Sequence, residues 1–252
     1  MASGPEPKPG VTLASRVAAQ LNQIQLKCVS PKLPRQTQTP SAATSREAES
    51  VLEPYLVFQP LYPIAHFVGL PGNLAKTYKN NVALWESPQP NPAINPKGFG
   101  YPYDDSPSGD VVVPCGLSST DYCMTYQSGA ALSTMAAMVT VPVGSGTAPV
   151  YTGVTMEIVA ITTTTVTIVY NTLPNYNPQT SKNWIGIWSG TGIPYTGLPA
   201  LAKAEIQNPY QKYFVEISLQ FEPYLAPYLA VYFTGPESTN IAAALSFTPP
   251  AS

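Results

Sequence analysis

The chain has 252 residues, of which 44% are hydrophobic and only 10% are charged, with a formal net charge of −2. Its 29 prolines and 17 glycines exclude a fold of long helices and predict short strands joined by irregular loops. The few, scattered Lys and Arg residues argue against a nucleic-acid-binding protein, because displacing counterions from phosphates requires clustered basic side chains.

Residues 1–50 are predicted to form an N-terminal arm that is mildly basic, with six Lys and Arg against three Glu. Apolar residues between Val11 and Ile24 recur every three or four positions, which predicts a short amphipathic helix over residues 11–27. Its apolar face could dock on the molecule's own body, on a neighbouring copy or on a membrane surface. Docking on protein is favoured, because the polar face carries Gln and Asn and not the Lys and Arg of an interfacial helix. Residues 29–50 mix Pro, Ser, Thr and Gln without periodicity, which is typical of a linker.

The first residues of the chain do not place an apolar core after a basic region, so we expect no Sec-type signal peptide. Synthesis in the cytosol is expected, export by another route stays open, and the final localisation is unknown. No apolar run is long enough for a transmembrane helix.

The remaining chain contains an internal sequence repeat. With an offset of 103 positions, Leu70-Pro71 aligns with Leu173-Pro174, Thr77 with Thr180, Lys79-Asn80 with Lys182-Asn183, and residues 82–85 with 185–188. With an offset of 106, residues 122–129 align with 228–235. The repeat predicts two tandem units, residues 51–142 and 148–252, joined by a short linker.

Each unit is predicted to hold six or seven short strands, the number that a two-sheet antiparallel sandwich needs. The predicted strands are 55–58, 64–68, 79–85, 110–113, 122–129 and 135–141 in the first unit, and 154–158, 163–170, 183–188, 213–219, 228–233 and 241–247 in the second. The predicted fold is therefore all-β, with two tandem immunoglobulin-like, Greek-key sandwiches behind the arm.

The run Asn183-Trp184-Ile185-Gly186-Ile187 and the later Tyr-x-x-x-Tyr-Phe-x-Gly hairpin carry a family resemblance. The second unit resembles the immunoglobulin-like domains of the SKICH family and the N-terminal β-sandwich of plant-type purple acid phosphatases. The first unit matches more weakly, since Asn81 stands where the family has Trp and Ala83 where it has Gly. The resemblance implies an interaction or targeting module and not an enzyme, because the phosphatase metal-ligand motifs lie outside the resembling domain.

The loop over residues 87–108 contains six prolines, so it cannot be interior sheet. Within it, the run from Asp104 to Asp110 places oxygen side chains and Gly109 at the spacing of a calcium loop. However, Cys115 stands where a bidentate Glu is required, which favours a polar turn over a calcium site.

His66 is the only histidine and no nucleophile motif accompanies it, so a structural role is favoured over that of a catalytic base. Cys115 and Cys123 could form a disulfide across neighbouring strands, but buried free thiols are favoured because apolar residues replace them in the second unit. Cys28 could link two chains or remain inert. The sequence thus predicts no catalytic residue, no metal site and no cofactor.

Four aromatic residues are the candidates for a binding surface: Trp184, which has no counterpart in the first unit, and the loop residues Tyr101, Tyr103 and Tyr195. Such rings are enriched at protein interfaces and also stack on sugars. Trp85 and Trp188 recur at equivalent positions and are expected to pack inside the protein. For Trp184, packing in the core or between the domains is favoured over a binding role, and packing of loops against Pro accounts for most of the tyrosines.

Two functions remain open. The favoured one is a non-enzymatic interaction or self-assembly protein, for example a coat or shell subunit, whose arm contacts a neighbouring copy. Low surface charge favours it, since few charges oppose association. The alternative is a protein that recognises carbohydrates or surfaces, such as a lectin or a toxin component, in which two linked sites would gain avidity.

Overall fold

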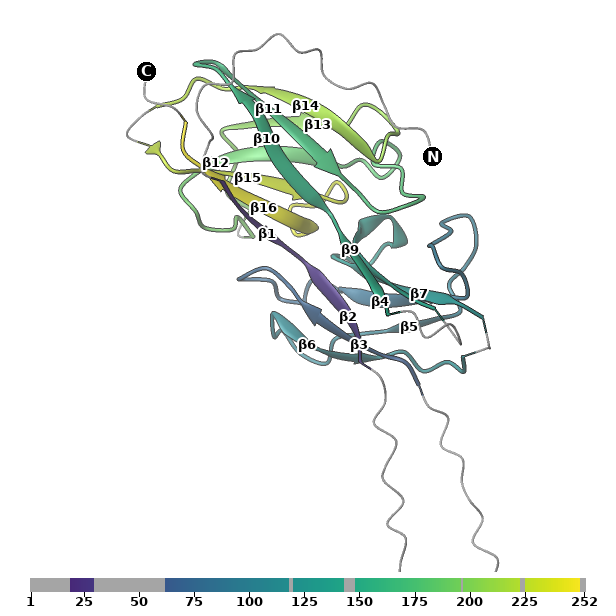
Figure 1. Ribbon diagram of the computed structural model, residues 1–252. Helices are drawn as coiled ribbons and strands as arrows, with labels where there is room; N and C mark the ends of the chain where they lie inside the picture. The colour runs from purple at the N-terminus through teal and green to yellow at the C-terminus, as the bar shows by residue number, and fades with distance from the viewer. Residues whose placement is uncertain are drawn as a thin grey trace, which may run out of the picture.

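The computed structural model describes residues 19–29, 62–117, 120–142, 148–195, 197–222 and 225–249 (Figure 1). These residues form an all-β protein, as predicted, with four antiparallel sheets and one 3₁₀ turn, η1 (Leu132–Thr134). Within this part of the chain, no helix has the length and apolarity to cross a membrane. The strand predicted over residues 55–58 lies outside the described residues.

The first unit is a sandwich of a three-stranded and a five-stranded sheet. The smaller sheet has the order β2 (Gln25–Val29), β3 (Ile64–Val68), β6 (Ser108–Val112), and the larger one β5 (Gly98–Gly100), β4 (Asn81–Trp85), β7 (Tyr122–Gln127), β8 (Met135–Val141), β9 (Val150–Gly153). Val82 and Leu84 of β4 are fully buried between the two sheets.

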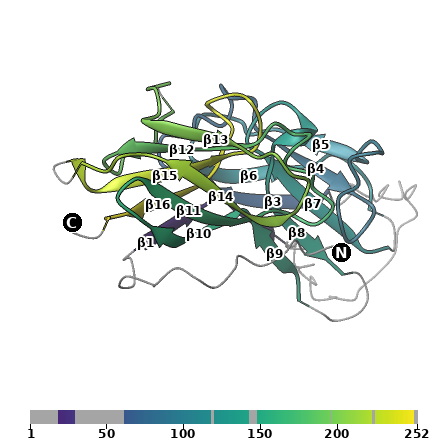
Figure 2. The same cartoon turned by 90° about the horizontal axis from the view of Figure 1, so that it is seen from above.

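The second unit repeats this arrangement, and Figure 2 shows the sheets of both units from above. Its smaller sheet has the order β10 (Thr155–Ile161), β11 (Thr165–Asn171), β14 (Lys212–Ser218), and its larger one β1 (Ala19–Gln23), β16 (Ile241–Phe247), β15 (Tyr228–Phe233), β12 (Trp184–Ser189), β13 (Ala202–Glu205). Counted from β2 in the first unit or from β10 in the second, strands one, two and five form the smaller sheet. Strands seven, six, three and four lie side by side, in that order, in the larger sheet. This is an immunoglobulin-like strand order, and it is the same in both units.

The helix predicted over residues 11–27 is wrong for residues 19–27, which form β1 and most of β2; residues 11–18 lie outside the described part of the chain. Ile24 and Leu26 are buried while Gln25 and Lys27 are exposed, which is the two-residue period of a strand. The local spacing suggested a helix, but pairing with β16 and β3, which are far away in sequence, determines the conformation.

Two segments of the chain cross from one unit to the other, so that each contributes a strand to both (Figure 1). β1 pairs with β16 of the second unit, and the chain then passes through Ile24 into β2, which pairs with β3 of the first unit. β9 and β10 do the converse: β9 pairs with β8 of the first unit, and the chain passes through Val154 into β10 of the second. The backbone N–H groups of Ile24 and Val154 bond to the carbonyls of Ala242 and Ala136, which are 106 positions apart.

This exchange is organised around an approximate twofold axis between the units. Ser128 and Thr234 occupy the same position in the two units, and their hydroxyl oxygens lie 2.8 Å apart. A residue contacts its own counterpart only at such an axis. The strand crossing and this contact together show that the units meet symmetrically.

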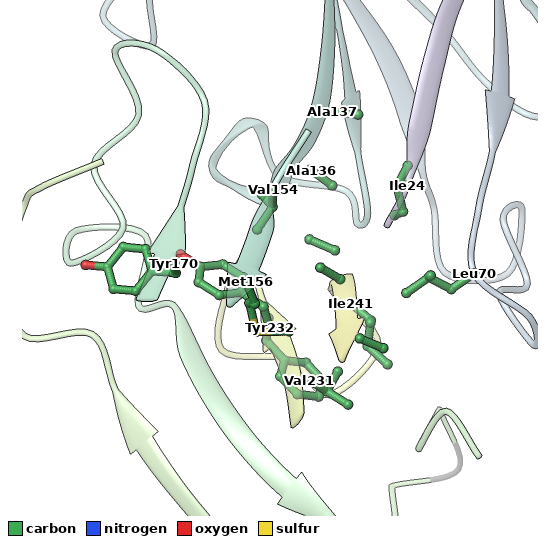
Figure 3. Close-up of a cluster of buried hydrophobic side chains, with 14 of the residues drawn as sticks. Ile24, Leu70, Ala136, Ala137, Val154, Met156, Tyr170, Val231, Tyr232 and Ile241 are labelled. Atoms are coloured by element: carbon green, nitrogen blue, oxygen red, sulfur yellow. The ribbon is translucent and has the colours of Figure 1, made fainter. Parts of the chain in front are cut away.

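One buried cluster runs through both sandwiches and across their boundary. Figure 3 shows Ile24, Ala136, Val154 and Ile241, which come from both units, lying together with Leu70 at the crossing. Burial of these apolar side chains at about 25 cal/mol per Å² makes each unit depend on the other for part of its stability.

The two recurring tryptophans are buried, with different neighbours. Trp85 is 2% exposed and belongs to a second cluster that includes Leu173 and Tyr176 of the other unit. Trp188 is 7% exposed and lies beside Phe233 of its own unit, with ring centroids 5.8 Å apart. The outer face of β4 is thus covered by the second unit.

Candidate interaction surface

The segment of residues 101–107, here called the tyrosine loop, is fastened to the turn that contains Thr77. The Asp105 carboxylate accepts hydrogen bonds from the Thr77 backbone N–H at 2.7 Å and from its hydroxyl at 2.8 Å. Asp104 Oδ1 accepts a hydrogen bond from the Ser106 N–H at 2.9 Å. These bonds to the Thr77 backbone and side chain hold the pKa of Asp105 below its ordinary value, so the carboxylate form fixes the loop.

The loop presents two tyrosine rings to solvent. Tyr101 is 66% exposed and Tyr103 is 89% exposed, the largest values among the bulky apolar and aromatic side chains of the described residues. The Lys76 ammonium lies 5.7 Å from the centroid of the Tyr103 ring, and Leu74 on the same turn is also exposed. Two of the four predicted site residues are therefore exposed on one loop, and Tyr103 lies beside a cation.

Tyr195, the third candidate, is not on the surface. It is 8% exposed and stacks on Tyr78 of the first unit, with ring centroids 5.4 Å apart. Among the described residues its hydroxyl has no hydrogen-bond partner, and burial raises the pKa of the phenol. Tyr195 joins the two units, and because Tyr78 and Lys76 lie on one turn, it supports the turn on which the tyrosine loop rests.

Trp184, the fourth candidate, is half-buried and packs against other side chains. Its ring stacks on Phe233 of β15 with centroids 3.7 Å apart and an interplanar angle of 1°. From β13, on the other side of β12, the Lys203 ammonium lies 5.7 Å from the ring centroid. Trp184 also lines a small pocket of about 430 Å³ with Lys182, Lys203 and Gln207, which shares no residue with the tyrosine loop.

The residues from Asp104 to Asp110 do not act together as a calcium loop would. Asp105 binds Thr77, Asp104 binds Ser106, and Asp110 Oδ1 lies 2.7 Å from Nδ1 of His66. Among the described residues, no group of three or more His, Cys, Asp or Glu side chains could hold a metal ion. His66 is half-exposed on the outer face of β3 and has a structural partner.

The three cysteines are free thiols. Cys123 is buried, and burial raises the pKa of its thiol to about 12, which makes it inert. Cys28 lies in β2 with its sulfur 3.9 Å from the Tyr122 hydroxyl, so it packs inside the first unit instead of projecting from an arm.

A polar groove at the unit boundary was not predicted from the sequence. It has a volume of about 770 Å³, and residues with amide or hydroxyl side chains line it together with apolar ones such as Leu132 and Met135. Asn175 of the second unit donates to Gln89 Oε1 at 3.1 Å and to the Pro90 carbonyl at 3.3 Å, which ties the proline-rich loop to the second unit. The groove depends on how the two units pack, and no local pattern could have revealed it.

No protein-family model matches the chain, and no curated protein matches it either. The interpretation of the candidate surface therefore rests on its geometry.

Proposed function

We propose that this protein is a non-enzymatic structural subunit that assembles with further copies of itself, as a coat or shell subunit does. The observation that carries the proposal is the pair Tyr101 and Tyr103, which are exposed although their loop is hydrogen-bonded in place. The resemblance to SKICH domains, which implies an interaction module, supports the same function.

The physical reason is the cost of ordering an interface. A flexible loop loses conformational freedom when it binds, and this loss subtracts from affinity. The bonds of Asp105 to Thr77 remove much of that cost before binding. Tyrosine adds a large, rigid, amphipathic contact area, which explains its enrichment at interface centres.

Low charge favours association of like molecules. Only 10% of the residues are charged, and the net charge is −2, so repulsion between copies is weak. Further apolar side chains are exposed around both units, among them Ile94 at 56%, Val150 at 56% and Leu198 at 63%. A subunit that buries several small patches against several neighbours needs this distribution.

Light scattering coupled to size-exclusion chromatography tests the proposal. The full chain is expected to elute as an oligomer, and Tyr101→Ser/Tyr103→Ser is expected to shift it toward monomer with an unchanged melting temperature. The control is Ser106→Ala, in the same loop, which leaves both rings in place. A monodisperse monomer of the full chain at high concentration would contradict the proposal.

The arm needs a deletion that ends at residue 18. β1 and β2 belong to the sheets, so a longer truncation would remove folded strands and confuse assembly with stability. If residues 1–18 contact a neighbouring copy, the deletion lowers the assembly state without lowering the melting temperature.

The groove at the unit boundary favours a second candidate function, recognition of a neutral carbohydrate. Uncharged amides and hydroxyls such as Asn91, Asn177 and Thr180 line it, and such groups bind sugar hydroxyls. A glycan array with the full chain tests this function. Signals that survive Asn177→Ala and Thr180→Ala would place the binding elsewhere, and a blank array would remove the candidate.

A further inference from the structure

We infer that residues 19–29, here called the crossing segment, are exchanged between neighbouring copies in the assembly, so that each copy donates these two strands to the next. The inference rests on the proposed self-assembly and names the element that links the copies. It follows from a difference between two crossings that are otherwise equivalent.

The two crossings match in backbone pairing. In the crossing segment, Gln23 pairs with Ala243 and Leu26 with Phe67. In residues 150–161, Gly153 pairs with Ala137 and Met156 with Tyr170. Ala243 and Ala137 are 106 positions apart, and Tyr170 and Phe67 are 103 apart, so the pairings are counterparts.

The two crossings differ in how the chain holds them. Residues 150–161 are fixed at both ends: eight residues, 142–149, join β8 to β9, and three residues, 162–164, join β10 to β11. No strand precedes the crossing segment in the described part of the chain, and 34 residues, 30–63, separate β2 from β3. An extended chain of that length spans on the order of 110 Å.

This length removes the covalent constraint on partner choice. A unit of about 100 residues has a radius of gyration of only about 13 Å, so the connection is long enough to reach an adjacent molecule. The three-residue connection of the twin crossing allows pairing only within its own chain. The long connection therefore allows residues 19–29 to pair with a neighbouring copy. The short one confines residues 150–161 to their own chain.

The exchanged arrangement keeps the contacts of the closed one. The crossing segment brings backbone pairs with β16 and β3 and the buried side chains Ile24 and Leu26, which are 1% and 2% exposed. A copy that receives the same segment from a neighbour forms the same bonds, which is why swapping identical elements costs little. The entropy lost when two copies associate is then offset by new contacts between the copies, such as those of the tyrosine loop.

A disulfide between β2 and β3 reports which chain supplies the strand. Gln25 and Val68 pair directly and are both exposed, so Gln25→Cys/Val68→Cys places two thiols within bridging distance. The matched control is Thr155→Cys/Asn171→Cys, the same pair in the twin crossing. Both variants carry Cys28→Ala and Cys115→Ala, which leaves only the buried Cys123.

The assembled fraction is oxidised and its mass is measured under denaturing, non-reducing conditions. For the Gln25/Val68 pair, we expect covalent dimers or larger chains, at twice the monomer mass or more; the Thr155/Asn171 pair should give monomers only. An assembly in which the Gln25/Val68 pair also gives only monomers overturns the exchange and leaves the proposed function intact. If no assembled fraction exists, the proposed function fails first.

A second variant keeps the test decisive if oxidation is incomplete. Replacing residues 30–63 by the three residues 162–164 ties β2 to its own β3, as in the twin crossing. This chain is expected to fold and to remain monomeric. Assembly of the shortened chain to the same state as the full chain would overturn the exchange.

Discussion

Asn183 donates a hydrogen bond from its side-chain amide to the hydroxyl of Tyr232 at 2.8 Å, inside the core of the second unit. Asn80 and Tyr126 form the same bond at 2.7 Å in the first unit. All four side chains are buried, at 5% exposure or less. The bond ties the turn before the central strand to the hairpin at the end of the unit, and both units have kept it.

Removing the amide should destabilise either unit. Asn183→Ala and Asn80→Ala each leave a buried tyrosine hydroxyl without this donor, so we expect a loss of about 1–3 kcal/mol in the free energy of unfolding. Urea unfolding followed by far-ultraviolet circular dichroism measures it. Asn91→Ala, at an exposed position, is the control and should change little; equal effects at positions 91 and 183 would contradict the role of this bond.

The residue before each of these asparagines has a left-handed backbone. Lys79 has φ 58° and Lys182 has φ 56°, a region in which a Cβ atom is strained. We expect Lys182→Gly to stabilise the protein by up to about 1 kcal/mol, because relief of strain exceeds the entropy that glycine adds to the unfolded chain. Lys203→Gly, inside β13, should instead destabilise it. Thermal unfolding of the two variants distinguishes these outcomes.

Gly186 is needed because two indole rings lie over it. A Cβ atom at this position would lie 2.5 Å from Cη2 of Trp188 and 2.9 Å from Cζ3 of Trp184. We expect Gly186→Ala to cost about 1–3 kcal/mol through overpacking and to shift the tryptophan fluorescence. In the first unit, Ala83 stands at the position of Gly186 and Asn81 at the position of Trp184.

That difference between the units suggests a second substitution, Trp184→Asn, to combine with Gly186→Ala. Trp184→Asn removes one of the two rings, so Gly186→Ala should cost less in the Trp184→Asn background than in the native protein. Guanidinium unfolding of all four chains gives the coupling free energy. Additive effects would mean that the two side chains do not share the space.

Alkaline pH should unfold the protein through its buried tyrosines. Burial raises the pKa of Tyr126 and of Tyr176 to about 12, against 10.0 for a free phenol. Between these values the unfolded chain releases protons that the folded one retains, so stability is full below pH 10 and falls as the pH rises toward 12. Each tyrosine should contribute about 3 kcal/mol to this loss.

Urea unfolding at several pH values above 9 measures the slope. Tyr176 lies at the unit boundary, where its hydroxyl is 3.0 Å from Asn183 Oδ1. Tyr176→Phe should flatten the dependence of stability on pH by about one proton. A slope identical to that of the native protein would show that Tyr176 ionises equally in both states.

The tandem units could be predicted because identical local chemistry recurs along the chain. The alignment of Lys79-Asn80 with Lys182-Asn183 identified residues that share a backbone angle and a buried bond. Strands such as β12 and β15 were found as short apolar runs bounded by turn residues. These signals are carried by neighbouring residues and need no knowledge of the partner strand.

For the four aromatic binding candidates, the structure gives the exposure and the packing partners, and their role in binding stays a prediction. Tyr101 and Tyr103 are exposed as expected, whereas Tyr195 and Trp184 are covered by Tyr78 and by Phe233 and Lys203. Aromatic loop residues look alike in sequence whether they meet solvent or another ring. The polar groove was missed for the same reason, because its two walls come from different units.

The sequence by itself determined the fold class, the repeat and the positions of most strands, because these follow from composition and from short-range patterns. Only the tertiary structure decided that residues 19–29 are strands and that the units exchange them. Pairing between Gln23 and Ala243, 220 positions apart, satisfies backbone hydrogen bonds that a local helix would also satisfy. The choice between the two lies in the apolar surface that Ile24 and Leu26 bury at the unit boundary, and that surface exists only once both units have formed.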